Sequence, residues 1–142
     1  SVGNRIWGAN TEMTYNPTVT NRVNHRRIIY YNVKDDKQKD FWRYRERAKK
    51  TWEEMKMENR VGVMNCISGC DGNWVQVRFH HKDFTSEEEA WEKMPVFAET
   101  YNDLFGEGSF MEDRERLRNS LMPNGRRIRH HKRLPELSSA WR

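Results

Sequence analysis

The apolar positions that repeat with a regular period lie between residues 28 and 122, and both ends of the chain are poor in them. Residues 28–33 have the sequence IIYYNV, and this β-branched and aromatic run predicts a short strand. Residues 36–58 contain neither Gly nor Pro. Core-type side chains recur there every three or four positions, which predicts a helix whose inner face carries Phe41, Tyr44, Arg45, Ala48, Trp52 and Met55.

Residues 60–81 have the pattern of a β-hairpin, in which the turn-forming segment 68–73 separates two runs of alternating side chains. On the second strand Val75, Val77 and Phe79 share one face, and we expect that face to contact the core. The opposite face is expected to meet solvent or a partner, and it carries Trp74, Gln76, Arg78 and His80.

Two further helices are predicted after the hairpin. Residues 85–107 hold a helical spacing of apolar residues, and Pro95 is expected to kink or divide this helix. A shorter helix follows at 109–122, with Ser109 as its N-cap and Glu112 completing a capping box.

These elements follow the order β-α-β-β-α, which predicts an α+β fold with a small three-stranded sheet, helices on one face and extended arms at both ends. If residues 128–134 formed a fourth strand, the order would become that of ferredoxin-like folds. The expected division of the chain is an extended basic arm at 1–27, an α+β core domain at 28–108, a short helix at 109–122 and a basic C-terminal arm at 123–142.

Charge is distributed unevenly along the 142 residues, whose formal net charge is +5. Residues 1–27 carry four Arg and one acidic residue, and residues 123–142 carry six Lys or Arg and one acidic residue. The stretch between them holds 16 basic and 19 acidic residues. The basic surplus therefore belongs to the two arms, and the central part is slightly acidic.

The densest basic run, residues 126–133, suits several kinds of partner. Arg and Lys neutralise phosphates, so ribosomal RNA is one of them. An acidic protein surface or anionic lipid head groups satisfy the same donors, and the acidic central part favours these over RNA. Arg and Trp residues often anchor interfaces. The predicted partner-binding set is Arg5, Trp7, Tyr15, Arg126, Arg127, Arg129, Lys132, Arg133, Trp141 and Arg142.

Aromatic residues of the predicted strands are a second candidate for contact with RNA. Single-stranded RNA modules stack bases on aromatic side chains of central strands, and Tyr30 or Tyr31 and Trp74 or Phe79 could act in this way. The glycine-containing RNA-binding signature is absent from residues 73–79. Core packing or contact with a partner is therefore the favoured role of these rings.

Cys66 and Cys70 are the only cysteines, and the pair His80 and His81 follows at a spacing that invites comparison with zinc sites. Adjacent strand residues point to opposite faces, so the two histidines cannot easily reach one ion. A disulfide between the cysteines would require an oxidising setting. We expect neither a metal nor a cofactor, and the low cysteine content favours a reducing intracellular compartment.

No nucleophile is paired with a base at a recognisable spacing, and no Gly-rich phosphate loop is present. We therefore expect no enzymatic activity and no catalytic residue. No apolar run approaches the roughly 20 residues of a membrane-spanning helix, so no transmembrane segment is predicted.

The favoured function is that of a non-catalytic structural accessory subunit, whose arms bridge neighbouring protein subunits of a large assembly. A mitochondrial respiratory-chain or ATP-synthase-type complex is the preferred setting, with the cytosol as the alternative location. The alternative function is an RNA-binding protein of a ribosome-like or mitoribosome-like particle, with the C-terminal basic arm on rRNA phosphates.

Overall fold

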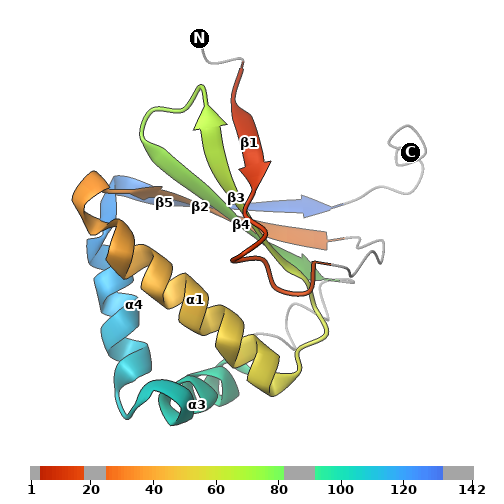
Figure 1. Ribbon diagram of the computed structural model, residues 1–142. Coiled ribbons are helices and arrows are strands. Elements are labelled where there is room, and N and C mark those ends of the chain that lie inside the picture. Colours follow the sequence, from red (N-terminus) through yellow and green to blue (C-terminus); the bar gives the residue numbers. More distant parts are fainter. Residues whose placement is uncertain (1–3, 18–24, 82–91, 133–142) are drawn as a thin grey trace.

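The computed structural model describes residues 4–17, 25–81 and 92–132 (Figure 1). These residues form one antiparallel sheet of five strands and three α-helices. In chain order the elements are β1 (Ile6–Ala9), β2 (His25–Val33), a 3-10 turn (Asp35–Lys37), α1 (Gln38–Met55), β3 (Val61–Ser68), β4 (Asn73–His81), α3 (Met94–Phe105), α4 (Ser109–Asn119) and β5 (Leu121–Lys132).

The predicted α+β class is confirmed, but the predicted three-stranded sheet is wrong. The strands lie in the order β1-β3-β4-β2-β5, and all neighbours are antiparallel. The three expected strands are present as β2, β3 and β4. The other two come from the segments that were expected to be extended arms: β1 pairs with β3 at one edge, and β5 pairs with β2 at the other.

The strand β5 begins where the sequence predicts the end of a helix and the start of a free arm. Its first residue, Leu121, pairs with Val33, whereas Arg126 pairs with Tyr31, so the intervening residues form an irregularity within the strand. A side chain at Gly125 would lie 2.6 Å from the Met122 carbonyl oxygen. Residues 123–125, Pro-Asn-Gly, therefore lie at this irregularity, and the strand continues beyond them. Without β1 and the additional helix α4, the order of elements is that of the ferredoxin-like alternative.

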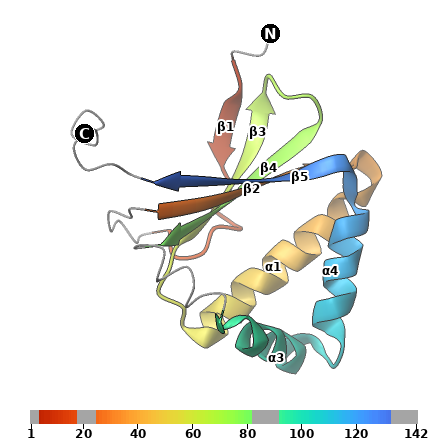
Figure 2. The same ribbon diagram turned by 180° about the vertical axis from the view of Figure 1, so that it is seen from behind.

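All three helices cover the same face of the sheet, and the opposite face carries no helix among the described residues (Figures 1 and 2). The core between sheet and helices is rich in aromatic rings, which bury large areas and pack edge to face. Phe41 and Trp52 of α1, Phe97 and Tyr101 of α3 and Phe110 of α4 are all buried there. The predicted inner face of the first helix is confirmed at Phe41, Arg45, Ala48 and Trp52.

A buried carboxylate joins the three helices. Asp113 of α4 lies 2.7 Å from Nη1 of Arg47 on α1 and accepts a hydrogen bond of 2.6 Å from the hydroxyl of Tyr101 on α3. Nε of Arg43 lies 3.7 Å from the same carboxylate. Burial and the hydrogen bond to Asp113 raise the pKa of Tyr101, so this phenol stays protonated and donates. The contact fixes the positions of α3 and α4 against α1.

Two details of the helix ends differ from expectation. Gly108, with φ of 79°, precedes α4, and the Ser109 hydroxyl donates to the Phe105 carbonyl, so Ser109 does not cap the helix. Pro95 lies in the first turn of α3, where its missing N–H costs nothing. The predicted start of this helix at 85–86 lies outside the described residues. None of the described helices is long and apolar enough to cross a membrane.

Candidate functional site: the open face of the sheet

The side of the sheet that faces away from the helices is called the open face here. Strand alternation decides its composition. Val75 and Val77 of β4 and Tyr31 and Val33 of β2 are buried against the helices, which confirms the predicted inner face of β4. The open face consequently carries Trp7 of β1, Gly62 and Met64 of β3, Trp74, Gln76, Arg78 and His80 of β4, Arg26, Ile28, Tyr30 and Asn32 of β2, and Arg127, Arg129 and His131 of β5.

The register of the strands brings arginines together on this face. Ile28 of β2 is paired with Arg78 on one side and with Arg129 on the other. Ile28 is only 4% exposed although none of the described helices covers it, which fits shielding by the aliphatic stems of these two arginines. In the next row Arg127 is paired with Tyr30. Three guanidinium groups from β4 and β5 therefore surround the centre of β2.

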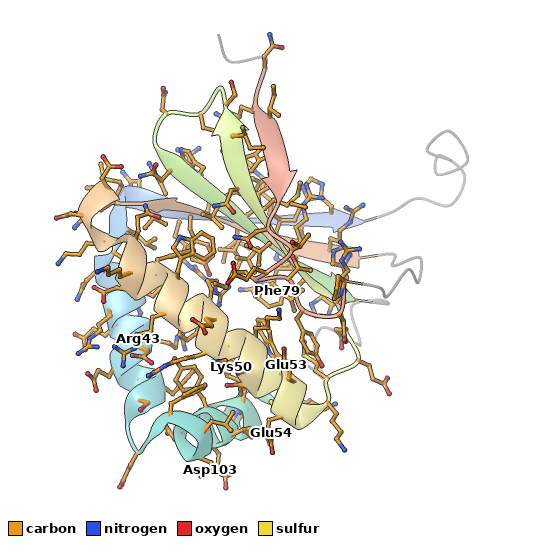
Figure 3. The ribbon with its side chains drawn as sticks, viewed as in Figure 1. Arg43, Lys50, Glu53, Glu54, Phe79 and Asp103 are labelled. Atoms are coloured by element: carbon orange, nitrogen blue, oxygen red, sulfur yellow. A yellow bond between two sulfur atoms is a disulfide. The ribbon has the colours of Figure 1, made fainter. Side chains whose placement is uncertain are left out.

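The five strands supply no carboxylate to the open face. None of the five strands contains an Asp or a Glu. The salt bridges seen in the described parts of the chain all join helix residues, such as Arg47 to Asp113 and Lys50 to Glu46. Acidic side chains, including Glu53 and Glu54 of α1 and Asp103 of α3, lie instead on the helical side (Figure 3). The described residues therefore form one basic face and one face with both acidic and basic side chains.

Burial and the excess of positive charge lower the pKa of two side chains on this face. The pKa of His80 is lowered to about 4, first by burial and then by Arg26, Arg60 and Arg78. The pKa of Arg78 is also lowered, first by burial and then by Arg26. Lowered pKa values of cationic groups mean that their charged forms are disfavoured where they lie. An anion bound at this cluster would relieve that repulsion.

Aromatic rings lie beside the cationic cluster. Trp7 contacts Tyr30 edge-on, with ring centroids 6.2 Å apart. The guanidinium of Arg127 lies 5.5 Å from the ring centroid of Trp74, which is a cation–π contact. Beneath the rings Gln76 is 3% exposed, and it accepts a hydrogen bond of 2.9 Å from Nε of Arg78. Rings from β1, β2 and β4 therefore share one surface with the arginines.

The structure brings together part of the predicted partner-binding set. Trp7, Arg127 and Arg129 lie on the open face, and Arg5 is exposed just before β1. The side chain of Arg126 is exposed and belongs to the other side of β5, because Arg126 pairs with the inward-facing Tyr31. Lys132 is the last residue of β5. Outside the described residues lie Arg133, Trp141 and Arg142.

Tyr15 is placed differently from the other members of the set. It is 6% exposed and forms a bridge to Val61, the first residue of β3. Its hydroxyl donates to the Met57 carbonyl oxygen at 2.6 Å. Burial raises the pKa of this phenol. Tyr15 thus packs the chain after β1 onto the end of α1, and no part of it lies on the open face.

Sequence reasoning missed the central cationic cluster. The alternation in β4 assigned Arg78 and His80 to the side away from the core, and the structure confirms that side. Arg26 and Arg60 are distant from them in sequence, and only the pairing of β2 and β3 with β4 brings them near. The alternation of Arg26, Ile28 and Tyr30 with the core-facing residues of β2 could have placed Arg26 on the same face as Arg78.

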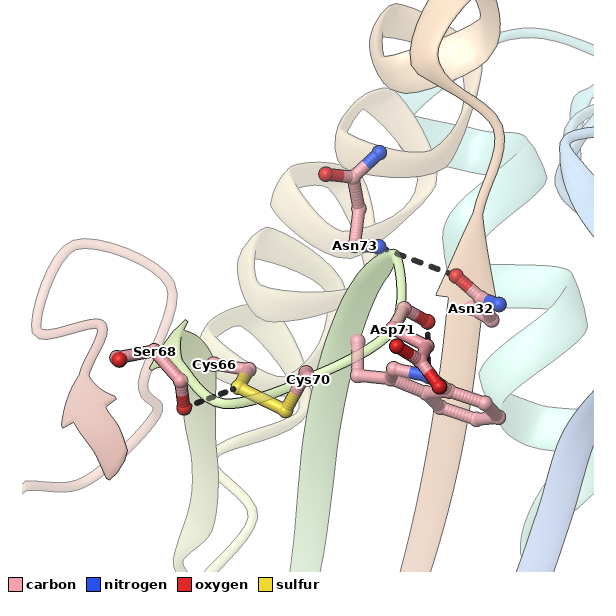
Figure 4. Close-up of a disulfide and its surroundings, with 7 residues drawn as sticks. Asn32, Cys66, Ser68, Cys70, Asp71 and Asn73 are labelled. Atoms are coloured by element: carbon pink, nitrogen blue, oxygen red, sulfur yellow. Dashed lines mark hydrogen bonds between the residues drawn. A yellow bond between two sulfur atoms is a disulfide. The ribbon is translucent and has the colours of Figure 1, made fainter. Parts of the chain in front are cut away.

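The two cysteines form a disulfide at the end of the hairpin (Figure 4). Neither cysteine is therefore free to bind zinc. No group of three metal-ligating side chains is present among the described residues. The disulfide lies at the end of β3, and Cys66 is the register partner of Trp7.

No protein-family model, curated protein or solved structure matches this chain. The functional inference therefore depends on the open face itself.

Proposed function

We propose that the open face binds a single-stranded nucleic acid. The observation that carries the proposal is a cluster of arginines, with aromatic rings beside it, on a sheet whose strands contain no acidic residue. Phosphates would supply a counter-charge that the described strands do not contain, and their binding would release condensed cations. Affinity is then expected to fall steeply as the salt concentration rises.

The aromatic rings favour a single strand over a duplex. Bases in a duplex are stacked on each other, whereas the bases of a single strand can stack on protein rings. Trp7, Tyr30 and Trp74 are each partly exposed on the open face. Guanidinium groups next to them, such as that of Arg127, are placed to meet the phosphates while the rings meet the bases.

The acidic balance of the central part of the chain favoured a protein partner when charge was counted by segment. In the folded chain, acidic residues and many of the basic residues that are mixed with them in the sequence lie on different faces of the sheet. The acidic residues of α1, α3 and α4 lie on the other side of the sheet from Arg26, Arg78 and Arg129. A strand of phosphates on the open face therefore meets only basic and neutral side chains of the described sheet.

Fluorescence anisotropy with a labelled 12-nucleotide RNA or DNA strand tests this proposal. We expect binding at low salt, with a steep linear fall of log K with log salt concentration. Arg129→Gln and Arg78→Gln should each weaken binding and reduce the salt slope by about 0.7, the contribution of one phosphate contact to a single strand. The same sequence as a duplex should bind more weakly, because its bases cannot stack on the rings.

Arg118→Gln is the matched control, because Arg118 is an exposed arginine of α4 on the helical side. It should leave the affinity for the labelled strand unchanged. No binding at low salt would overturn the proposal, and so would an equal loss in the Arg118 and Arg129 variants. Duplex binding as tight as single-strand binding would remove the role given to the rings. Thermal unfolding of each variant separates loss of binding from loss of the fold.

A protein partner on the helical side is the second candidate function, and it follows from a groove of about 550 Å³ between α1 and α3. Its apolar lining includes Met55, Val96 and Leu104, of which Val96 is 51% exposed. The charged residues of the lining are Glu54, Asp103 and Lys93, and Figure 3 shows the two acidic ones on the helical side. An apolar groove with a net acidic border suits a basic amphipathic helix of another subunit.

This second candidate keeps the accessory-subunit hypothesis, and a mitochondrial respiratory-chain or ATP-synthase-type complex stays its preferred setting as a prediction. Val96→Glu together with Leu104→Glu should abolish co-migration with such a complex on native gels of detergent-extracted mitochondria. Binding of the labelled strand should be unaffected. Co-migration that survives both substitutions would contradict this use of the groove.

A further inference from the structure

The Cys66–Cys70 disulfide closes a three-residue loop at an exposed end of the sheet (Figure 4). The residues between the two cysteines are all exposed, and Ile67 is 69% exposed. A reductant in solution can therefore reach the region of the bond. The loop continues β3 on the side where β1 is attached, so its conformation bears on β1.

The first half of β1 rests on this loop. Trp7 pairs with Cys66, and Ile6 pairs with Ser68 across a register irregularity. The side chain of Ile67 occupies the space that a Cβ on Gly8 would fill. Among the described strands β1 pairs only with β3, so the start of β1 depends on its contacts with this end of β3 and the loop.

The segment that follows β1 is attached elsewhere and does not depend on the loop. The Asn10 amide N–H donates to the Val63 carbonyl at 2.8 Å, and the Asn10 side chain donates to Asn65 Oδ1 at 2.9 Å. Tyr15 then pairs with Val61. A change in the loop would therefore loosen the start of β1 and leave its end in place.

We propose that the disulfide is a redox switch that sets the affinity of the open face by holding Trp7 against Tyr30. This inference rests on the proposed function, because its readout is the binding of a single strand. In the oxidised form the closed loop fixes Cys66 and its partner Trp7. In the reduced form the loop gains conformational freedom, the start of β1 separates from β3, and one stacking ring is lost from the open face.

The reductant that this switch requires is a dithiol. One thiolate of the dithiol attacks a sulfur of the Cys66–Cys70 bond and forms a mixed disulfide, which releases the other cysteine as a thiolate. The second thiol of the reductant then attacks the mixed disulfide, closes its own disulfide and releases the remaining cysteine. Two electrons and two protons pass from the dithiol to the protein, which ends with two thiols.

The test compares the oxidised and dithiothreitol-reduced proteins in the single-strand binding assay. We expect reduction to weaken wild-type binding by about tenfold, the order of one lost stacking contact. The Cys66→Ser, Cys70→Ser double variant should bind like reduced wild type and ignore dithiothreitol. Trp7→Ala should bind weakly in both states. Equal affinity of oxidised and reduced wild type, or a Trp7→Ala variant that still responds to reductant, would overturn the proposal.

Hydrogen exchange without nucleic acid separates this inference from the proposed function. The backbone amides of residues 6–8 should exchange at least tenfold faster in the reduced protein, whereas the amide of Asn10 should keep its protection. If the oxidised protein bound no single strand, the proposed function would fail, and exchange would still decide whether the loop holds β1. Unchanged exchange at residues 6–8 would show that the disulfide does not control this strand.

Discussion

The ring of Trp7 lies edge-on to the ring of Tyr30, with centroids 6.2 Å apart, although β3 and β4 separate the two strands that carry them. The two side chains therefore reach toward each other across the open face, and Gln76 is buried beneath them. This contact connects the edge strand β1 to the centre of the sheet. It also places two rings where a base could stack on them.

Removal of the Tyr30 ring tests that role. Tyr30→Ala should weaken binding of a labelled single strand by about tenfold or more, because a stacking contact contributes about 1–3 kcal/mol. Tyr30→Phe keeps the ring and is the matched control, so its affinity should stay near that of the wild type. If the two variants bound equally, the ring of Tyr30 would have no part in recognition. Fluorescence anisotropy at constant salt provides the measurement.

The buried carboxylate of Asp113 should be the most sensitive charge in the helical layer. Asp113→Asn leaves Arg47 half-buried without its counter-charge and weakens the acceptor for Tyr101. We expect the free energy of unfolding to fall by about 3 kcal/mol, as for one partner removed from a buried pair. The control is Glu112→Gln, which breaks only the exposed pair with Arg116 and should cost less than about 1 kcal/mol. Urea denaturation measures both.

Within the described part of the chain, Arg45 is a buried charge without the close ion pair that Asp113 has, so its replacement is expected to have a different effect. It is 5% exposed, its Nε and Nη1 have no hydrogen-bond partner among the described residues, and its guanidinium lies 4.9 Å from the ring centroid of Tyr44. Replacement of a poorly compensated buried charge by an apolar side chain is often neutral or stabilising. Arg45→Met should therefore leave the unfolding free energy unchanged or raise it. Arg47→Met, which removes the nearest cation from the buried Asp113, should lower it. A loss of more than about 2 kcal/mol in Arg45→Met would show that the cation–π contact outweighs the burial of charge.

The lowered pKa of His80 makes a prediction about pH. With a pKa near 4 in the folded protein and 6.5 as its ordinary value, His80 binds a proton more readily in the unfolded chain. The contribution of this group to stability is therefore fully present above pH 6.5 and is lost as the pH falls from 6.5 to 4. His80→Gln should reduce the loss of stability over that range, which thermal unfolding at a series of pH values would show.

Binding of a phosphate polymer should act on the same group. Negative charge near Arg26, Arg60 and Arg78 offsets the repulsion that these arginines exert on a protonated imidazole. The pKa of His80, followed by NMR of its ring protons, should rise when a single strand is added at low salt. An unchanged pKa would place the bound strand away from this cluster.

Local sequence signals predicted the middle of the fold well, because they depend on near neighbours. The alternation of Val75, Val77 and Phe79 and the helical spacing from Phe41 to Trp52 correctly identified the core-facing sides of β4 and α1. Of the two edge strands, β1 was not predicted, and β5 entered only as the alternative fourth strand at 128–134, for physical reasons. β1 has only four residues, one of them Gly, and it is stabilised by pairing with β3. β5 contains Pro-Asn-Gly, which is typical of a chain leaving a structure.

The candidate site depends still more on distant contacts. Trp7, Arg127 and Arg129 were among the predicted partner-binding residues, but nothing in their spacing shows that they meet Arg78 on one surface. Register between strands decides this, and register comes from the packing of the whole sheet. The net charge of each sequence segment does not show the basic open face either, because residues adjacent in sequence alternate between the two faces of each strand.

In the described part of the chain, a sheet without carboxylates lies beside helices that carry them, and this arrangement of charge corresponds to an electric dipole directed through the sheet. In the field of a polyanion the protein would turn before contact, so that β2, β4 and β5 lead and α1, α3 and α4 trail. Such orientation raises the fraction of encounters that become productive, and it weakens as salt screens the field over about 10 Å. The separation of charge between strands and helices would then govern how quickly a partner is found, before any ring or guanidinium touches it.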